Sequence, residues 1–204
     1  MMKVATITAG AVATNSYVLF NERSECVVVD PGDGISEVIA YLDKNALDCK
    51  HVLLTHAHFD HCDGCGTLQR RGAKIYMSAD DLPLLSTSDN LAEAFGEKFE
   101  PFTPDVIVKD GDELSLLGEK FDVIATPGHT NGSVCYKVND LIFSGDTLFR
   151  LSIGRTDFPT GNYADMENSL AKLFALDGDY VVYPGHGEKS TLGYERKYNP
   201  YARI

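Results

Sequence analysis

Short apolar runs alternate with turn-forming residues along the whole chain. The run Cys26-Val27-Val28-Val29 is almost purely β-branched, which is typical of a strand buried on both faces. Similar runs, bounded by Gly, Pro, Asn and Asp, predict the other strands. The predicted strands cover residues 4–8, 16–20, 26–30, 51–55, 74–77, 106–108, 113–117, 121–126, 133–138, 141–144 and 180–183.

Apolar side chains at helical spacing predict helices over residues 36–45 and 163–176, and a shorter helix over 62–71. Residues 83–104 are the least regular stretch, and there Leu91, Ala94 and Phe95 predict a short helix that packs on the core. Two strand-rich halves, each with its own helices, favour two sheets packed face to face with helices outside. The sequence therefore predicts one domain over residues 1–204, a four-layer α/β/β/α sandwich.

The charge balance excludes several classes of partner. The 204 residues include 18 Lys and Arg against 30 Asp and Glu, a formal net charge of −12. Nucleic acids and anionic membranes both require clustered basic residues, so neither is an expected partner. No apolar run is long enough for a transmembrane helix, and the first residues are too polar for a signal peptide. Five scattered cysteines do not suggest a disulfide framework, and the expected location is the cytoplasm.

Four side chains that commonly bind metals lie within six residues of one another. His56, His58, Asp60 and His61 directly follow the predicted buried strand at 51–55. His56 and His58 are two positions apart, so at an extended strand end both side chains point the same way. Buried imidazoles and carboxylates each need a polar partner, and one metal ion supplies a partner common to all of them.

Three further candidates repeat this arrangement. His129, Asp146 and His186 each follow a predicted strand, in a loop that contains glycine. Such loops let the backbone approach a ligand, and sites in layered α/β folds commonly lie at this end of the strands. His51 begins a strand and shares its loop with no other candidate, so it is predicted not to bind metal.

Taken together, these motifs resemble the metallo-β-lactamase superfamily. They are Thr-His-x-His-x-Asp-His from Thr55, Pro-Gly-His-Thr at 127–130, Ser-Gly-Asp-Thr at 144–147 and Pro-Gly-His-Gly at 184–187, in that order. The early Asp30-Pro31-Gly32 turn is also similar. Within the superfamily, residues 145–149, 153–159 and 191–200 resemble the short glyoxalase II-like hydrolases.

The resemblance implies two adjacent divalent metals, zinc in the first instance, with iron or manganese as alternatives. Imidazole and carboxylate ligands suit all three metals. It implies that Asp60 also acts in catalysis, by orienting a metal-bridging hydroxide. The implied ligands are His56, His58 and His129 for one metal, Asp60, His61 and His186 for the other, and Asp146 as the bridge.

The implied activity is hydrolysis of a small-molecule thioester of the S-lactoylglutathione type. Full-length glyoxalase II enzymes carry a C-terminal helical domain that helps to hold glutathione, and residues 187–204 offer no counterpart. Arg150 and Arg155 are the cations nearest to Asp146 in sequence and are candidates for substrate binding, although Arg155 is equally suited to an ion pair with Asp157.

Several alternatives remain open. A persulfide dioxygenase of the same fold would use one iron, held by His56, His129 and Asp146, and it shares the stretch at 154–158. A β-lactamase would carry a signal peptide, and an RNA-processing nuclease would be more basic. The flavin-linked diiron branch has Glu in place of His58, and a non-catalytic metal protein would be expected to lose some ligands. The Cys62-x-x-Cys65 pair is interpreted as helix packing, with a redox pair as the alternative.

Overall fold

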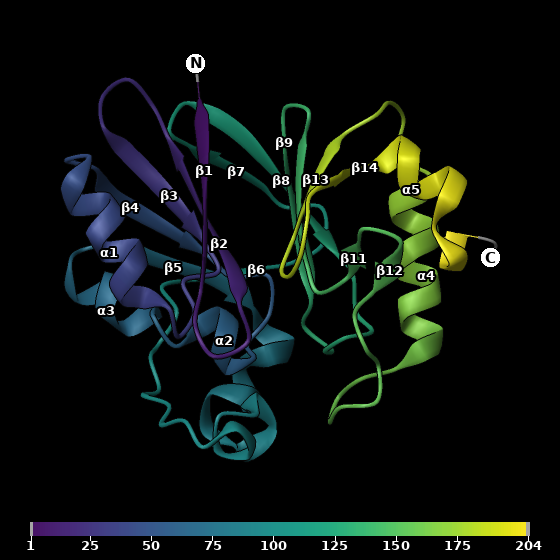
Figure 1. The fold of residues 1–204 in the computed structure, drawn as a ribbon, viewed down its shortest axis with the longest axis horizontal. Helices are drawn as coiled ribbons and strands as arrows, with labels where there is room; N and C mark the ends of the chain where they lie inside the picture. Colours follow the sequence, from purple (N-terminus) through teal and green to yellow (C-terminus); the bar gives the residue numbers. More distant parts are fainter. Residues whose placement is uncertain (1, 203–204) are drawn as a thin grey trace.

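The computed structural model describes residues 2–202 and confirms the layered sandwich. Two six-stranded sheets pack face to face (Figure 1). Helices α1 (Ile35–Lys44) and α3 (Cys65–Arg70) cover one outer face, and α4 (Tyr163–Phe174) and α5 (Leu192–Tyr198) cover the other. Within the described residues no helix is long and apolar enough to span a bilayer.

The first sheet has the order β1-β2-β3-β4-β5-β6. Its first three strands pair antiparallel, and β3 to β6 pair parallel. The carboxyl ends of β3, β4 and β5 therefore lie at one edge of the sheet. The strands are β1 (Lys3–Ala9), β2 (Thr14–Phe20), β3 (Glu25–Val29), β4 (Asp48–Leu53), β5 (Lys74–Ser78) and β6 (Val106–Val108).

The second sheet has the order β14-β13-β10-β9-β8-β7. Its only parallel pair is β10 with β13, so the loops that follow these two strands leave the sheet side by side. The strands are β7 (Glu113–Leu116), β8 (Glu119–Ala125), β9 (Val134–Val138), β10 (Leu141–Gly145), β13 (Val181–Pro184) and β14 (Ser190–Thr191). A two-stranded ribbon of β11 (Leu148–Phe149) and β12 (Ser152–Ile153) follows β10.

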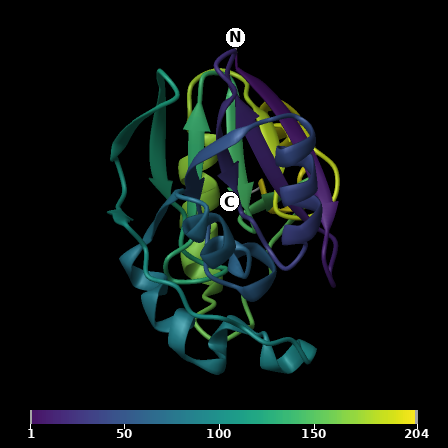
Figure 2. The ribbon, with the colours of Figure 1, turned by 90° about the vertical axis from the view of Figure 1, so that its left-hand side faces the viewer.

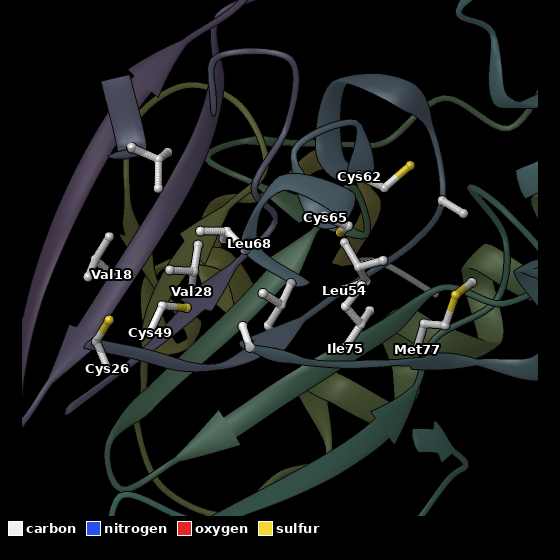
Figure 3. Close-up of a cluster of buried hydrophobic side chains, with 14 of the residues drawn as sticks. Val18, Cys26, Val28, Cys49, Leu54, Cys62, Cys65, Leu68, Ile75 and Met77 are labelled. Carbon is white, nitrogen blue, oxygen red and sulfur yellow. The ribbon is translucent and has the colours of Figure 1, made fainter. Parts of the chain in front are cut away.

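The strand β3 is buried on both faces, as its valines predict. Val28 belongs to the cluster beneath α1 and α3, whereas Val27 and Val29 pack between the two sheets. The first cluster also contains Cys62 and Cys65 (Figure 3). The five cysteines are all buried free thiols.

The prediction of one helix over residues 62–71 is wrong in detail. The segment forms α2 (Phe59–Cys62) and α3, which are separated at Asp63 and Gly64. The amide of Gly64 donates to the carbonyl of Pro31 at 2.8 Å, and a Cβ at Gly64 would lie 2.6 Å from that oxygen. This close approach ties the start of α3 to the turn after β3 and interrupts the helix. The helix α5 was not predicted.

The prediction of a core-facing helix near Leu91 is also wrong. Residues 79–95 form three 3₁₀ helices, η1 (Ala79–Ser86), η2 (Ser88–Asn90) and η3 (Glu93–Phe95), at the end of the molecule where α2 lies (Figures 1 and 2). Leu91 has a left-handed backbone with a φ of 70°, which breaks the helical spacing. Ala92 is buried instead, while Ala94 and Phe95 are exposed.

Candidate metal centre

The structure brings together all seven predicted ligand residues at the carboxyl ends of the central strands. They form three overlapping groups in which the potential ligand atoms lie within 4.8 Å of one another. The groups are His56, His58 and His129; His56, His61 and Asp146; and Asp60, His61 and His186. His51 lies outside all three groups, and its Nδ1 faces the Tyr76 hydroxyl at 3.1 Å.

The first group contains three imidazoles whose ring nitrogens converge. His129 Nδ1 donates to the carbonyl of Arg155 at 2.7 Å, which leaves the lone pair on Nε2. That Nε2 lies 2.9 Å from His58 Nδ1. His56 Nε2 is buried and has no hydrogen-bond partner among the described residues. Burial, together with the neighbouring histidines, holds the pKa of His56 and of His58 well below the ordinary value. Both are therefore neutral, as metal ligands must be.

The group of Asp60, His61 and His186 combines imidazoles with a carboxylate. His61 Nε2 lies 3.2 Å from Asp60 Oδ2 and 3.4 Å from His186 Nε2. Burial lowers the pKa of His61, but Asp60, Asp146 and the hydrogen bond to Asp30 outweigh it and raise that pKa well above the ordinary value. Within residues 2–202, only histidines form ion pairs with these three carboxylates. The site is thus rich in buried negative charge, which a divalent cation would compensate.

Asp146 lies between the group that contains His129 and the group that contains His186. Its Oδ1 is 3.4 Å from His61 Nε2, and its Oδ2 is 3.5 Å from His129 Nε2. The Oδ1 atom is buried and makes no hydrogen bond with the described residues. Gly185 leaves room for this carboxylate, because a Cβ there would lie 2.1 Å from Asp146 Oδ1. Asp146 Oδ1 and His56 Nε2 are both buried and unpartnered among the described residues, and their residues belong to the same group. Such a pair of atoms fits a divalent metal site.

Asp30 supports the centre through Thr55 and His61, a role that was not predicted beyond its place in the shared turn motif. Its carboxylate is 2 % exposed. It accepts hydrogen bonds from the amide of Thr55 at 2.8 Å and from Thr55 Oγ1 at 2.6 Å. It also lies 3.0 Å from His61 Nδ1 and accepts its proton in a hydrogen bond, so Nε2 is the ring nitrogen that faces the centre. An acid directly after a continuous buried strand is the sequence signal that could have identified it.

Asp81 joins two of the ligand loops, and sequence reasoning missed it. Its buried carboxylate accepts from the amide of Ala57 at 2.9 Å and from the amide of Gly132 at 2.7 Å. It also accepts from Thr130 Oγ1 at 2.9 Å. Burial raises its pKa in spite of these hydrogen bonds. Asp81 lies in η1, within the irregular segment, so no local pattern marks it.

The last loop is anchored to the other sheet. The amide of Asn15 donates to the carbonyl of Gly185 at 2.8 Å, and Asn15 Nδ2 donates to the carbonyl of Pro184 at 3.1 Å. Next to it, Thr14 Oγ1 donates to Asp60 Oδ2 at 2.7 Å. The start of β2 therefore holds both Asp60 and the turn that carries His186.

The two candidate substrate-binding arginines lie in different surroundings. Arg150 forms an ion pair with Glu188 and does not line the cavity at the centre. Arg155 lines that cavity, and its guanidinium makes two hydrogen bonds to Asp157, at 2.6 and 2.7 Å. The ion pair considered for Arg155 is therefore present.

Cys62 and Cys65 lie close to the centre in sequence but belong to the core. Burial raises the pKa of both thiols well above the ordinary value. A buried thiol that stays protonated is neither a metal ligand nor a reactive nucleophile. This favours the interpretation that the pair packs the helices.

Comparison with known proteins agrees with the motifs. Residues 9–186 match the metallo-beta-lactamase superfamily. The chain is 32 % identical to the hydroxyacylglutathione hydrolase GloC of Haemophilus influenzae, over 98 % of both chains. A solved B3 metallo-beta-lactamase, BLEG-1, is 33 % identical with a TM-score of 0.92, over 100 % of both chains.

A second solved structure, of the protein TTHA1623 in a di-iron-bound form, is 34 % identical with a TM-score of 0.87. The match covers 97 % of this chain and 100 % of that one. Family match, relatives and fold thus agree with the His and Asp residues gathered at the strand ends, and the chain belongs to the metallo-beta-lactamase superfamily.

Proposed function

We propose that this protein is a metal-dependent hydrolase that cleaves a thioester of the S-lactoylglutathione type. The observation that carries the proposal is the completeness of both ligand groups, joined by Asp146, beside one cavity that five of the seven residues line. One metal would be held by His56, His58 and His129, the other by Asp60, His61 and His186, and Asp146 would contact both. Such a pair supplies hydroxide at neutral pH and polarises a carbonyl oxygen.

We propose zinc as the metal, with iron or manganese as alternatives. The nitrogen and oxygen donors of these residues suit each of the three. The di-iron form of TTHA1623 shows that a similar chain holds iron.

The residues lining the cavity favour a thioester over an ester or amide. Apart from the predicted ligands, they include no lysine, tyrosine or cysteine that could donate a proton to a leaving group. A thiolate leaves without such help, because thiols are far more acidic than alcohols or amines. The similarity to GloC, which is named a hydroxyacylglutathione hydrolase, points to the same substrate class.

We propose Asp60 as the catalytic residue that orients the attacking water. Its Oδ2 accepts from Thr14 Oγ1 and lies 3.3 Å from His186 Nε2, so its orientation is fixed from two sides. Asp60→Asn should lower kcat by about 100-fold with little change in KM, because the nucleophile is disturbed rather than substrate binding. Asp63 is a nearby carboxylate that lies outside all three groups. The substitution Asp63→Asn is therefore the matched control and should retain full activity.

A second candidate is β-lactam hydrolysis, which the similarity to BLEG-1 favours. The deciding experiment offers one metal-loaded preparation S-lactoylglutathione, neutral acyl thioesters, a chromogenic β-lactam and glutathione persulfide. Thiol release, β-lactam opening and oxygen uptake are recorded in parallel. The expected result is thiol release that Asp60→Asn lowers by about 100-fold. Oxygen uptake with sulfite formation and no thiol release would instead identify a persulfide dioxygenase.

A further inference from the structure

A cavity of about 410 Å³ lies directly over the metal centre. This is near the lower end of the roughly 300–1,000 Å³ usual for ligand pockets, so it holds one small part of a substrate. His58, Asp60, His129, Asp146 and His186 form part of its lining. Most of the remaining wall is apolar and is made of Val12, Leu91, Phe95, Phe149, Ile153 and Phe158.

The wall carries no cation that is free to bind an anion. Arg155 is the one lysine or arginine among the lining residues, and Asp157 occupies its guanidinium through two hydrogen bonds. The same guanidinium stacks 3.9 Å from the centre of the Phe158 ring. That ring lies 5.7 Å from the His58 ring, measured between centroids. Arg155 therefore stacks on an apolar ring that lies beside His58, and the cavity wall offers a carboxylate-bearing group no unpaired lysine or arginine.

Leu91 and Phe95 are two neighbouring members of this wall and are called the rim below. The left-handed backbone of Leu91 is unusual for a residue with a side chain. It is fixed by its buried neighbours, since Asn90 Oδ1 accepts from the amide of Ala92 at 3.0 Å. Phe95 is 49 % exposed, and its ring lies 5.3 Å from that of buried Phe59. Two large apolar side chains are thus held at the cavity, where an apolar substrate group would cover them.

We propose that this cavity is an acyl pocket that selects thioesters with an apolar acyl group, and that Leu91 and Phe95 determine this specificity. The inference rests on the proposed thioester hydrolysis, because the carbonyl carbon must lie at the metal centre. Biological thiol carriers are polar and charged, so the carrier lies at the open edge and the acyl chain against the apolar wall. Each buried methylene is worth ~0.8 kcal/mol, which corresponds to about a fourfold gain per methylene.

The first experiment measures kcat/KM for N-acetylcysteamine thioesters with acetyl, butyryl, hexanoyl and octanoyl groups. This carrier is neutral, so only the acyl group varies. We expect kcat/KM to rise by about fourfold per methylene until the cavity is filled. Hexanoyl should exceed lactoyl on the same carrier by at least tenfold. A flat or falling series, or a preference for lactoyl, overturns the inference while leaving thioester hydrolysis intact.

The second experiment does not depend on turnover. Acetate, butyrate, hexanoate and octanoate, which are the acid products, are titrated calorimetrically into the metal-loaded protein. Their affinities should rise with chain length in the same way, and Leu91→Ala and Phe95→Ala should each flatten the series. Tyr198→Ala removes an aromatic ring that is 52 % exposed and lies outside the cavity lining, and it should leave the series unchanged.

The outcomes separate the two proposals. If affinity rises with chain length but no thioester is cleaved, the proposed hydrolysis fails and the apolar pocket stands. If thioesters are cleaved and affinity is independent of chain length, the acyl pocket fails. Equal slopes in Phe95→Ala and Tyr198→Ala would show that the rim does not set the specificity.

Discussion

Replacing Asp30 with Asn should weaken metal binding without removing any ligand. The carboxylate accepts from the amide of Thr55 on Oδ1, and from Thr55 Oγ1 and His61 Nδ1 on Oδ2. The side-chain amide of Asn has a single acceptor oxygen. In one orientation its NH₂ group faces the backbone N–H of Thr55, and in the other it faces the Nδ1 proton of His61. A buried donor without a partner costs about 1–3 kcal/mol.

His61 can escape this conflict only by moving its proton to Nε2, the nitrogen that faces Asp60 and Asp146. Loss of such a supporting hydrogen bond typically costs 10–100-fold in metal affinity, about 1.4–2.7 kcal/mol. The assay is competition with a chromophoric chelator, together with nitrogen NMR of the His61 ring to identify the tautomer. We expect the affinity for the more weakly bound of the two metals to decrease by about 10–100-fold. The NMR signal of the Nδ1-protonated tautomer should decline.

Asp81→Asn is the matched control. Asp81 is also a buried carboxylate with three donors, but it contacts no imidazole by hydrogen bond. It should lose thermal stability to a similar degree and keep the His61 tautomer, so any loss of metal affinity through its loosened loops should occur without a change of tautomer. If Asp30→Asn loses stability but binds both metals normally, or if both variants shift the His61 tautomer equally, the tautomer argument is refuted.

Three further predictions concern the same centre. The double variant Cys62→Ala, Cys65→Ala should keep full metal content and most activity by elemental analysis and thiol release, because both thiols are buried and protonated; a fall in metal content would make sulfur a ligand after all. Gly185→Ala should abolish full metal loading, since its Cβ would lie 2.1 Å from Asp146 Oδ1. Gly187→Ala is the control: its Cβ would meet no atom within 4 Å, and the positive φ at this position should cost only ~1 kcal/mol of stability. Removing metal with a chelator should lower the melting temperature, because ligand binding to the folded state stabilises it; added zinc should restore it, and an unchanged melting temperature would argue against a metal bound in the fold.

The residues that meet at the candidate metal centre could be predicted from sequence because they follow strands. Parallel pairing of β3 with β4 and of β10 with β13 brings the carboxyl ends of distant strands to one edge. The two sheets pack face to face with these edges together, so His56 after β4 and Asp146 after β10, 90 positions apart in sequence, meet in one group. Local hydrophobic pattern predicts where a strand ends, and the end of a strand is where these sites lie.

The surroundings of the ligands could not be predicted in this way. Asp81 lies in η1 and is held by hydrogen bonds to distant loops, whereas Leu91 follows η2 with a left-handed backbone, and periodicity predicts neither feature. Asp81 accepts a hydrogen bond from the amide of Gly132, 51 positions away, and no sequence pattern near either residue predicts this contact. Leu91 and Phe95 suggested a buried helix face, because an apolar residue in a cavity wall and one in a core look alike in a sequence.

The same segment links the metal centre to the proposed acyl pocket. Its first turn, η1, carries Asp81, which fixes the loops of His58 and His129 by way of Ala57 and Thr130. Its later turns carry Leu91 and Phe95 at the cavity. Because buried Asn90 and Ala92 separate these two functions, substitutions at the rim can change the cavity without moving the ligands. A change of acyl specificity is therefore expected to require fewer compensating changes than a change of metal ligand, since the rim is exposed and the ligands share their hydrogen bonds with the core.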